Sequence, residues 1–204
     1  MTTRGTDLAA VPAAREARWL RQVHGAAVAR LAAAPQAVEP QADASVANAP
    51  GVVCAIKSAD CLPVLFCDEQ GTAVGAAHAG WRGLSAGVLE ATVAAMPVKP
   101  AALLAWMGAA IGPASFEVGA EVREAFVAGD TGAAACFTPR PAAGKYLADL
   151  YGLARRRLAA AGVQRVYGGG LDTLRDAARF YSYRRDGRTG RMVSLVWLEG
   201  SALR

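Results

Sequence analysis

Residues 73 to 96 read AVGAAHAGWRGLSAGVLEATVAAM, and this stretch decides the fold. Ala73 to Ala77 is a short apolar run that predicts a strand, and the glycine-rich segment Gly80 to Gly83 predicts a loop after it. From Leu84 to Met96 apolar residues recur at helical spacing, and Pro97 marks the end of that helix. The stretch therefore predicts a strand, a glycine loop and a helix in succession.

Further strands and helices are predicted on both sides of this unit. Short apolar or alternating runs predict strands at residues 52–56, 62–67, 103–107, 164–167 and 191–198. Apolar residues at helical spacing predict helices at residues 118–127 and 147–161, and the stretch 129–144, rich in glycine, alanine and proline, predicts a surface loop. Because strands and helices intermix, we expect a mixed sheet in an α/β or α+β fold, rather than a barrel with eight repeats, forming a single domain over residues 1–204.

The composition is that of a globular protein without a membrane anchor. Hydrophobic residues make up 53% of the 204 residues, enough for one well-buried core. The net charge of +5 comes from arginines spread along the chain rather than from a basic tail, so nucleic-acid binding is not expected. No apolar run is long enough to cross a bilayer, and the four cysteines with no signal segment favour a reduced, cytoplasmic protein.

Three residues stand out as candidate metal ligands. His24 and His78 are the two histidines of the chain, and each lies where an apolar run meets glycine. Cys61 follows Ser58-Ala59-Asp60, between two predicted strands. Two imidazoles and a thiolate suit zinc or copper, and three protein ligands leave one coordination position for substrate or water. The sequence therefore predicts a metal centre built from residues far apart in the chain.

The same residues allow other interpretations. Each histidine could be a structural residue bound to backbone groups, and Cys61 could be a small buried hydrophobe. Cys61 could also be a nucleophile activated by His78, with Asp60 or another acid orienting the imidazole. His24 separates these hypotheses, because a cysteine and histidine dyad gives it no role whereas a three-ligand metal site requires it.

Two arginines and one aspartate are candidate substrate contacts. Arg82, after Gly80-Trp81, could bind phosphate or a carboxylate, or could pack on Trp81 or pair with an acid. Arg184 could reach an anionic substrate, or could be a strand arginine in an ion pair. Asp60 could fix a histidine tautomer, or could cap the turn before Cys61.

The chain resembles the laccase-domain family, also called polyphenol oxidase-like or YfiH-like, which is regarded as a family of multifunctional purine nucleoside phosphorylases. The resemblance runs in family order from about residue 19 to the end. It rests on the segments LRQVHG (20–25), ADA (42–44), PGV (50–52), SADCLPV (58–64), AHAGWRG (77–83), GAAIGP (108–113), FEVG (116–119), FYSYRR (180–185) and TGR (189–191).

The resemblance implies a metal, zinc or sometimes copper, held by His24, Cys61 and His78, in a fold of two central β-layers flanked by helices. It also implies phosphorolysis of adenosine, inosine and methylthioadenosine, and hydrolytic deamination of adenosine. The expected partners are a purine nucleoside and phosphate, and the expected assembly is a monomer or a homodimer. We take Arg82 as a catalytic and substrate-binding residue, and Arg184 and Asp60 as substrate-binding residues.

The sequence departs from the family pattern at two places. Family members usually carry a longer segment before the first histidine, so the N-terminal segment is shortened here. They also tend to place a cysteine before the threonine that follows the glycine-rich strand end, where this chain has Asp172 before Thr173. Alternative functions are a cysteine-type hydrolase or a peptidoglycan-precursor editing enzyme that uses Cys61 and His78. Polyphenol oxidation is not expected, because a multicopper cluster needs more than two histidines.

Overall fold

Two β-layers form the centre of the molecule. The computed structural model describes residues 1–199. The larger layer is a six-stranded mixed sheet with the strand order β11-β7-β5-β6-β3-β2. Its strands are β2 (Val28–Arg30), β3 (Ala44–Ala47), β5 (Leu62–Asp68), β6 (Val74–Ala79), β7 (Leu103–Met107) and β11 (Arg165–Gly168).

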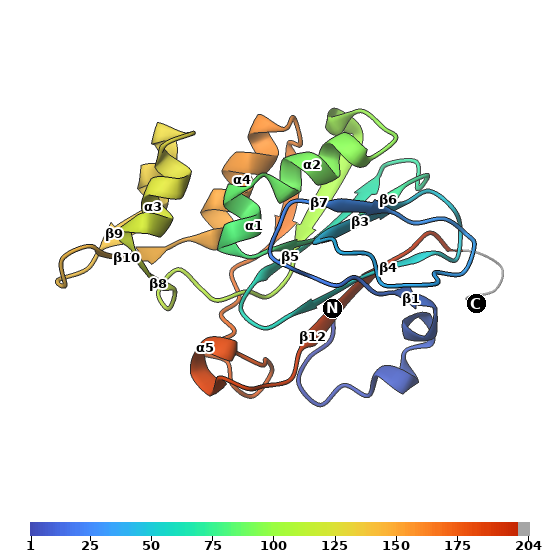
Figure 1. Ribbon diagram of the computed structural model, residues 1–204, viewed down its shortest axis with the longest axis horizontal. Coiled ribbons are helices and arrows are strands. Elements are labelled where there is room, and N and C mark those ends of the chain that lie inside the picture. The colour runs from blue at the N-terminus through green and yellow to red at the C-terminus, as the bar shows by residue number, and fades with distance from the viewer. Residues whose placement is uncertain (200–204) are drawn as a thin grey trace.

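A three-stranded sheet forms the second layer. It contains β1 (Ala17–Arg18), β4 (Val53–Ser58) and β12 (Met192–Val196) in the order β1-β4-β12. Strand β4 contacts β3, β5 and β6, and β12 contacts β5 and β6, so the two layers face each other (Figure 1). The outer side of β4 carries the short 3-10 helix η2 (Pro12–Glu16), which follows η1 (Leu8–Ala10). This arrangement confirms the prediction of an α+β fold with two β-layers.

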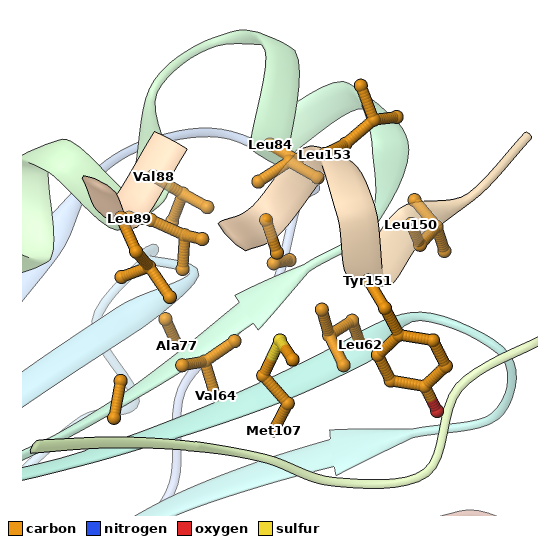
Figure 2. Close-up of a cluster of buried hydrophobic side chains, with 14 of the residues drawn as sticks. Leu62, Val64, Ala77, Leu84, Val88, Leu89, Met107, Leu150, Tyr151 and Leu153 are labelled. Atoms are coloured by element: carbon orange, nitrogen blue, oxygen red, sulfur yellow. The ribbon is translucent and has the colours of Figure 1, made fainter. Parts of the chain in front are cut away.

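The other face of the large sheet is covered by helices α1 (Trp81–Ser85), α2 (Val88–Ala95) and α4 (Leu150–Ala160) (Figure 1). Alternate side chains of β5, β6 and β7 point toward this face, and the intervening side chains of β5 and β6 pack in a second cluster with the smaller sheet. Buried side chains from both sides meet there, and Figure 2 labels Leu62, Val64, Ala77 and Met107 of the sheet and Leu84, Val88, Leu89, Leu150, Tyr151 and Leu153 of the helices. This core fixes the strand ends that carry the candidate site.

The predicted helix from Leu84 to Met96 is two helices. Helix α1 begins at Trp81, inside the segment that was predicted to be a loop, and ends at Ser85. Helix α2 begins at Val88, after Gly87 adopts a left-handed φ of 91°. A side chain is strained at that φ, so glycine permits the break that periodicity alone does not reveal.

The predicted loop 129–144 and the predicted helix 147–161 are also corrected. Residues 131–136 form the 3-10 helix η4 (Thr131–Cys136), and β9 (Phe137–Pro139) follows it. Strands β8 (Glu117–Gly119), β10 (Lys145–Ala148) and β9 make a small sheet in the order β8-β10-β9, next to α3 (Ala120–Val127). Helix α4 therefore starts only at Leu150, where the Asp149 side chain accepts a hydrogen bond from the Gly152 N–H as its cap.

The hydroxyl of Tyr151 holds the segment that follows β7. It accepts a hydrogen bond from the Ala110 N–H at 2.9 Å and lies 2.9 Å from the Leu171 carbonyl, to which it can donate. We expect Tyr151→Phe to lower the free energy of unfolding by about 1–3 kcal/mol, because a buried N–H loses its acceptor. Denaturant unfolding checks this. The control, Tyr167→Phe, alters a tyrosine that is 52% exposed and should change stability by less than about 0.5 kcal/mol. Equal effects of the two variants would contradict this role.

Candidate metal centre

Antiparallel pairing of β5 with β6 brings Cys61 next to His78. Cys61 directly precedes β5, and His78 lies near the end of β6, where it pairs with Pro63. Asp60, the residue before the cysteine, has a left-handed φ of 83°. A non-glycine residue in that conformation costs on the order of 1–3 kcal/mol, and such strain is concentrated at functional sites. The local backbone thus turns sharply where it presents the thiol.

His24 reaches the same place from a turn before β2. Its own φ is 62°, so the turn around it is also left-handed. Hydrogen bonds to the Asp43 carboxylate hold this turn, from the His24 N–H at 2.9 Å and from the Gly25 N–H at 2.7 Å. Asp43 also accepts from Nδ1 of His78 at 2.9 Å, so one carboxylate contacts both histidine segments.

The structure brings the three predicted ligands together. One ligand atom from each of His24, Cys61 and His78 lies within 4.8 Å of the other two. The two imidazole rings are 4.9 Å apart and meet edge to face at 70°. His78 is buried, Cys61 is half-buried and His24 is exposed, so the cluster opens to solvent on the His24 side.

The surroundings of Cys61 favour its thiolate form. Burial would raise the pKa of the Cys61 thiol, but hydrogen bonds and charge from His24 and His78 outweigh burial and lower that pKa to about 6. Burial would lower the pKa of His78, but hydrogen bonds to Asp43 and Cys61 raise it to about 9. The thiolate is the form of cysteine that binds metals, and an imidazole proton can be exchanged for a cation. These donors therefore fit zinc or copper.

A cavity of about 650 Å³ opens beside the cluster, and all three candidate ligands line it. Its lining includes the apolar side chains of Trp81, Ile111 and Phe116. Among residues 1–199, the lining contains one acidic residue, Asp60, and four cationic residues, which are Lys57, Arg82, Arg184 and Arg191. An excess of positive charge at a cavity favours anionic ligands.

Arg82 lies in this cavity on helix α1. Its guanidinium lies over the Trp81 ring, 4.5 Å from the ring centroid. Within residues 1–199, no acidic side chain pairs with Arg82 and its guanidinium has no hydrogen-bond acceptor. Of the alternatives for this residue, packing on Trp81 is what the structure shows, and the guanidinium remains available to a ligand.

Arg184 is in a helix rather than in a strand. It belongs to α5 (Tyr183–Asp186), which begins after the capping residue Ser182. Its Nη1 donates to the Glu117 carbonyl at 3.0 Å, and its guanidinium lies over Phe116 at 5.5 Å. Arg184 lines the cavity, and because one of its N–H groups donates to the Glu117 carbonyl, fewer donors remain for a ligand.

Asp60 binds neighbouring segments rather than a histidine. One carboxylate oxygen accepts from the Thr173 hydroxyl at 2.6 Å, and the other accepts from the Arg184 N–H at 2.7 Å. The hypothesis that Asp60 orients an imidazole is wrong, because Asp43 contacts His78 instead. Asp172, which stands where the family tends to have a cysteine, accepts a hydrogen bond from the Ser115 hydroxyl at 2.6 Å.

Three residues at the site were not predicted as site residues: Asp43 and Arg191, which lie in the segments ADA and TGR of the resemblance, and Lys57. Asp43 directly precedes β3, between Ala42 and Ala44, and is fully buried. A buried carboxylate must be paired or receive several hydrogen bonds, so an acid between two alanines at the beginning of an apolar run is the signal that the sequence offers. Lys57 and Arg191 carried no such signal, since exposed cations are common on strands and loops.

The fold and the site together define a mixed α+β protein with a candidate metal centre at the wall of a cavity. Residues 3–199 match the family model described as multi-copper polyphenol oxidoreductase laccase, and the chain belongs to that family. With only two histidines, the chain lacks the ligands for a multicopper cluster.

Relatives and solved structures agree with this assignment. The chain is 59% identical over 181 residues to purine nucleoside phosphorylase PA4543 of Pseudomonas aeruginosa, covering 89% of this chain and 74% of the relative. It is 57% identical over 180 residues to purine nucleoside phosphorylase YfiH of Escherichia coli, covering 88% and 73%. The crystal structure of Neisseria meningitidis protein NMB0706 superposes with a TM-score of 0.87 at 52% identity, covering 90% of this chain and 75% of that one.

Within the described residues, none of the helices has the length and apolar character needed to cross a membrane.

Proposed function

We propose that this protein is a metal-dependent purine nucleoside phosphorylase that converts adenosine, inosine or methylthioadenosine and phosphate to the free base and the sugar 1-phosphate. The observation that carries the proposal is the convergence of His24, Cys61 and His78 on a cavity whose lining includes Arg82, a cation without an acidic partner among residues 1–199. The names of the relatives support the same reaction class.

The donor set supports zinc, or copper, as the cofactor. When bound, such an ion supplies positive charge beside the reacting groups and an exchangeable position for an oxygen ligand. The apolar walls at Ile111 and Phe116 suit a purine ring and exclude water from it. Arg82 supplies a planar cation that can bind two phosphate oxygens at once. Arg184 and Asp60 shape the same cavity, with Asp60 holding the backbone of Arg184.

In the reaction, an oxygen of phosphate forms a bond to the anomeric carbon of the ribose while the bond from that carbon to the purine nitrogen breaks. The purine leaves with the electron pair and takes up a proton. The guanidinium of Arg82 orients the phosphate and balances its negative charge as the new bond forms. Deamination of adenosine is a second activity that we propose for this site: water adds to the purine carbon that bears the amino group, ammonia leaves from that carbon, and the bond to the ribose stays intact, which gives inosine.

Arg82→Gln should weaken phosphate binding more than nucleoside binding. A lost hydrogen bond to a charged group is worth about 1.5–3 kcal/mol, so the KM for phosphate should rise about 10- to 100-fold. Initial rates over a grid of both substrate concentrations separate the two KM values. Arg15→Gln is a matched control, because Arg15 is exposed on η2, away from the cavity lining. An unchanged KM for phosphate in Arg82→Gln would remove this residue from the proposed phosphate site.

Incubation with adenosine tests the proposed function. Zinc-loaded protein is incubated with adenosine, with and without phosphate, and adenine, inosine and hypoxanthine are separated by chromatography. Adenine that forms only with phosphate is the expected result for phosphorolysis, and inosine that forms without phosphate is expected for deamination. Neither product from metal-loaded protein would overturn the proposal. Turnover that survives in metal-free His24→Ala would instead support the cysteine-type hydrolase.

A further inference from the structure

One buried carboxylate connects two of the three proposed ligands. Asp43 directly precedes β3, between the turn that carries His24 and the strand that carries His78, and its side chain is 0% exposed. Its main chain also belongs to this junction, because the His78 N–H donates to the Asp43 carbonyl at 2.7 Å. Asp43 is outside the lining of the cavity, so it acts on the site through other residues.

Both carboxylate oxygens of Asp43 are saturated with donors. Oδ1 accepts from Nδ1 of His78 and from the His24 N–H, each at 2.9 Å. Oδ2 accepts from the Gly25 N–H at 2.7 Å and from the Val23 N–H at 3.1 Å. A carboxylate has about four acceptor positions, and all of them are used here. Three successive N–H groups can point at one anion because His24 adopts a left-handed φ.

We infer that Asp43 is a positioning residue that sets both histidines of the metal centre, by holding the His24 turn and by keeping the proton of His78 on Nδ1. Since Nδ1 of His78 is committed to the carboxylate, Nε2 is the nitrogen left for a metal. The inference rests on the proposed metal centre but not on the reaction catalysed there.

Asparagine cannot replace this carboxylate. Its side chain has one carbonyl oxygen, so at most one pair of donors keeps an acceptor while the other pair faces an NH₂ group. If the oxygen remains on the His78 side, it still accepts from the His24 N–H, but the Val23 N–H and the Gly25 N–H lose their acceptor and the turn around His24 is held less tightly. If the oxygen turns to the Gly25 side, His78 loses the partner that fixes its ring. Either outcome disturbs a proposed ligand.

Asp68 provides a matched control at the opposite end of β5 from Cys61. It is also buried, with 3% of its surface exposed, and it also holds a turn. Its carboxylate accepts from the Thr72 N–H and the Ala73 N–H, both at 2.7 Å, and from the Thr72 hydroxyl at 2.8 Å. Asp68→Asn therefore removes a comparable buried anchor without touching the candidate ligands.

Metal affinity of intact protein tests the inference. Zinc and cobalt(II) are titrated into wild type, Asp43→Asn and Asp68→Asn against a chromophoric chelator, and thermal unfolding reports whether each variant is folded. We expect a 10- to 100-fold loss of affinity in Asp43→Asn, as for other groups that orient metal ligands, and an altered cobalt absorption spectrum. Asp68→Asn should keep wild-type affinity. Wild-type affinity in folded Asp43→Asn, or an equal loss in Asp68→Asn, would overturn the inference.

A second measurement uses the wild type alone and so does not depend on the variants folding. Long-range proton and nitrogen-15 correlation spectra of the zinc-loaded protein assign the tautomer of each histidine. We expect His78 to carry its proton on Nδ1 and to bind zinc through Nε2. Zinc on Nδ1 would contradict the inference. Metal binding with this tautomer but without nucleoside turnover would reject the proposed reaction and leave the role of Asp43 intact.

Discussion

Cys61→Ala is expected to lower zinc affinity by about 100-fold or more and to abolish phosphorolysis with it. The thiolate is the anionic donor of the proposed triad, and the two imidazoles that remain are neutral ligands when they bind metal. Structural zinc sites with four ligands bind with about 10–16 kcal/mol, so the loss of one ligand removes several kcal/mol. Metal content after dialysis and rates of adenine release are measured on the same preparation.

Cys54→Ala is the control for this variant. Cys54 is also a free cysteine, but it is fully buried in β4, where burial raises the pKa of its thiol to about 11. It therefore behaves as a small hydrophobe, and its replacement should cost a modest amount of stability while leaving zinc affinity unchanged. Full zinc affinity in Cys61→Ala, or loss of zinc in Cys54→Ala, would contradict the assignment of Cys61 as a ligand.

Gly80→Ala should damage the metal centre while the chain still folds. The backbone of Gly80 is extended, with φ −67° and ψ 162°, which alanine adopts freely. A Cβ atom there would lie 2.7 Å from Sγ of Cys61 and 3.3 Å from Cδ2 of His24. The thiol must rotate away to relieve the contact, and this separates it from the two imidazoles. We expect a loss of zinc affinity of at least about 10-fold and a stability cost of about 1–3 kcal/mol.

Gly129→Ala serves as the matched substitution for Gly80→Ala. A Cβ at Gly129 has no atom within 4 Å, and the residue lies in an exposed connection after α3. That variant should bind zinc and release adenine like the wild type. If Gly80→Ala bound zinc as tightly as Gly129→Ala, then the close packing of β6, α1 and Cys61 would not be what holds the thiol in place.

Strands were predicted correctly where a run of buried apolar residues lies between turns. The runs at residues 62–67 and 103–107 are flanked by turn signals and form β5 and β7 with nearly the predicted bounds. Prediction failed at positions where the backbone conformation, rather than the pattern of apolar residues, decides whether a helix breaks or a strand forms. Periodicity could not reveal the break at Gly87, and Leu147 suits both the helix that was predicted and the strand β10 that forms. Short strands at the periphery, such as β9, carry too few apolar residues for a pattern to emerge.

Some residues of the candidate site could be predicted from the sequence and others could not. His24, Cys61 and His78 were predicted to lie together because rare side chains at the ends of apolar runs favour a shared sheet edge, and the structure brings them together. Asp43 was not predicted as a site residue because three of its four partners are main-chain N–H groups of the turn around His24, and the residue types there do not predict a left-handed φ. Binding of a metal by the triad, and the substrate roles of Arg82 and Arg184, stay proposals.

The most direct test is anomalous diffraction at the zinc edge from crystals of zinc-loaded protein. The account predicts a single strong peak among the three side chains, about 2.3 Å from Sγ of Cys61 and about 2.0–2.1 Å from one imidazole nitrogen of each of His24 and His78. Zinc found elsewhere, with these three side chains bare, would contradict it.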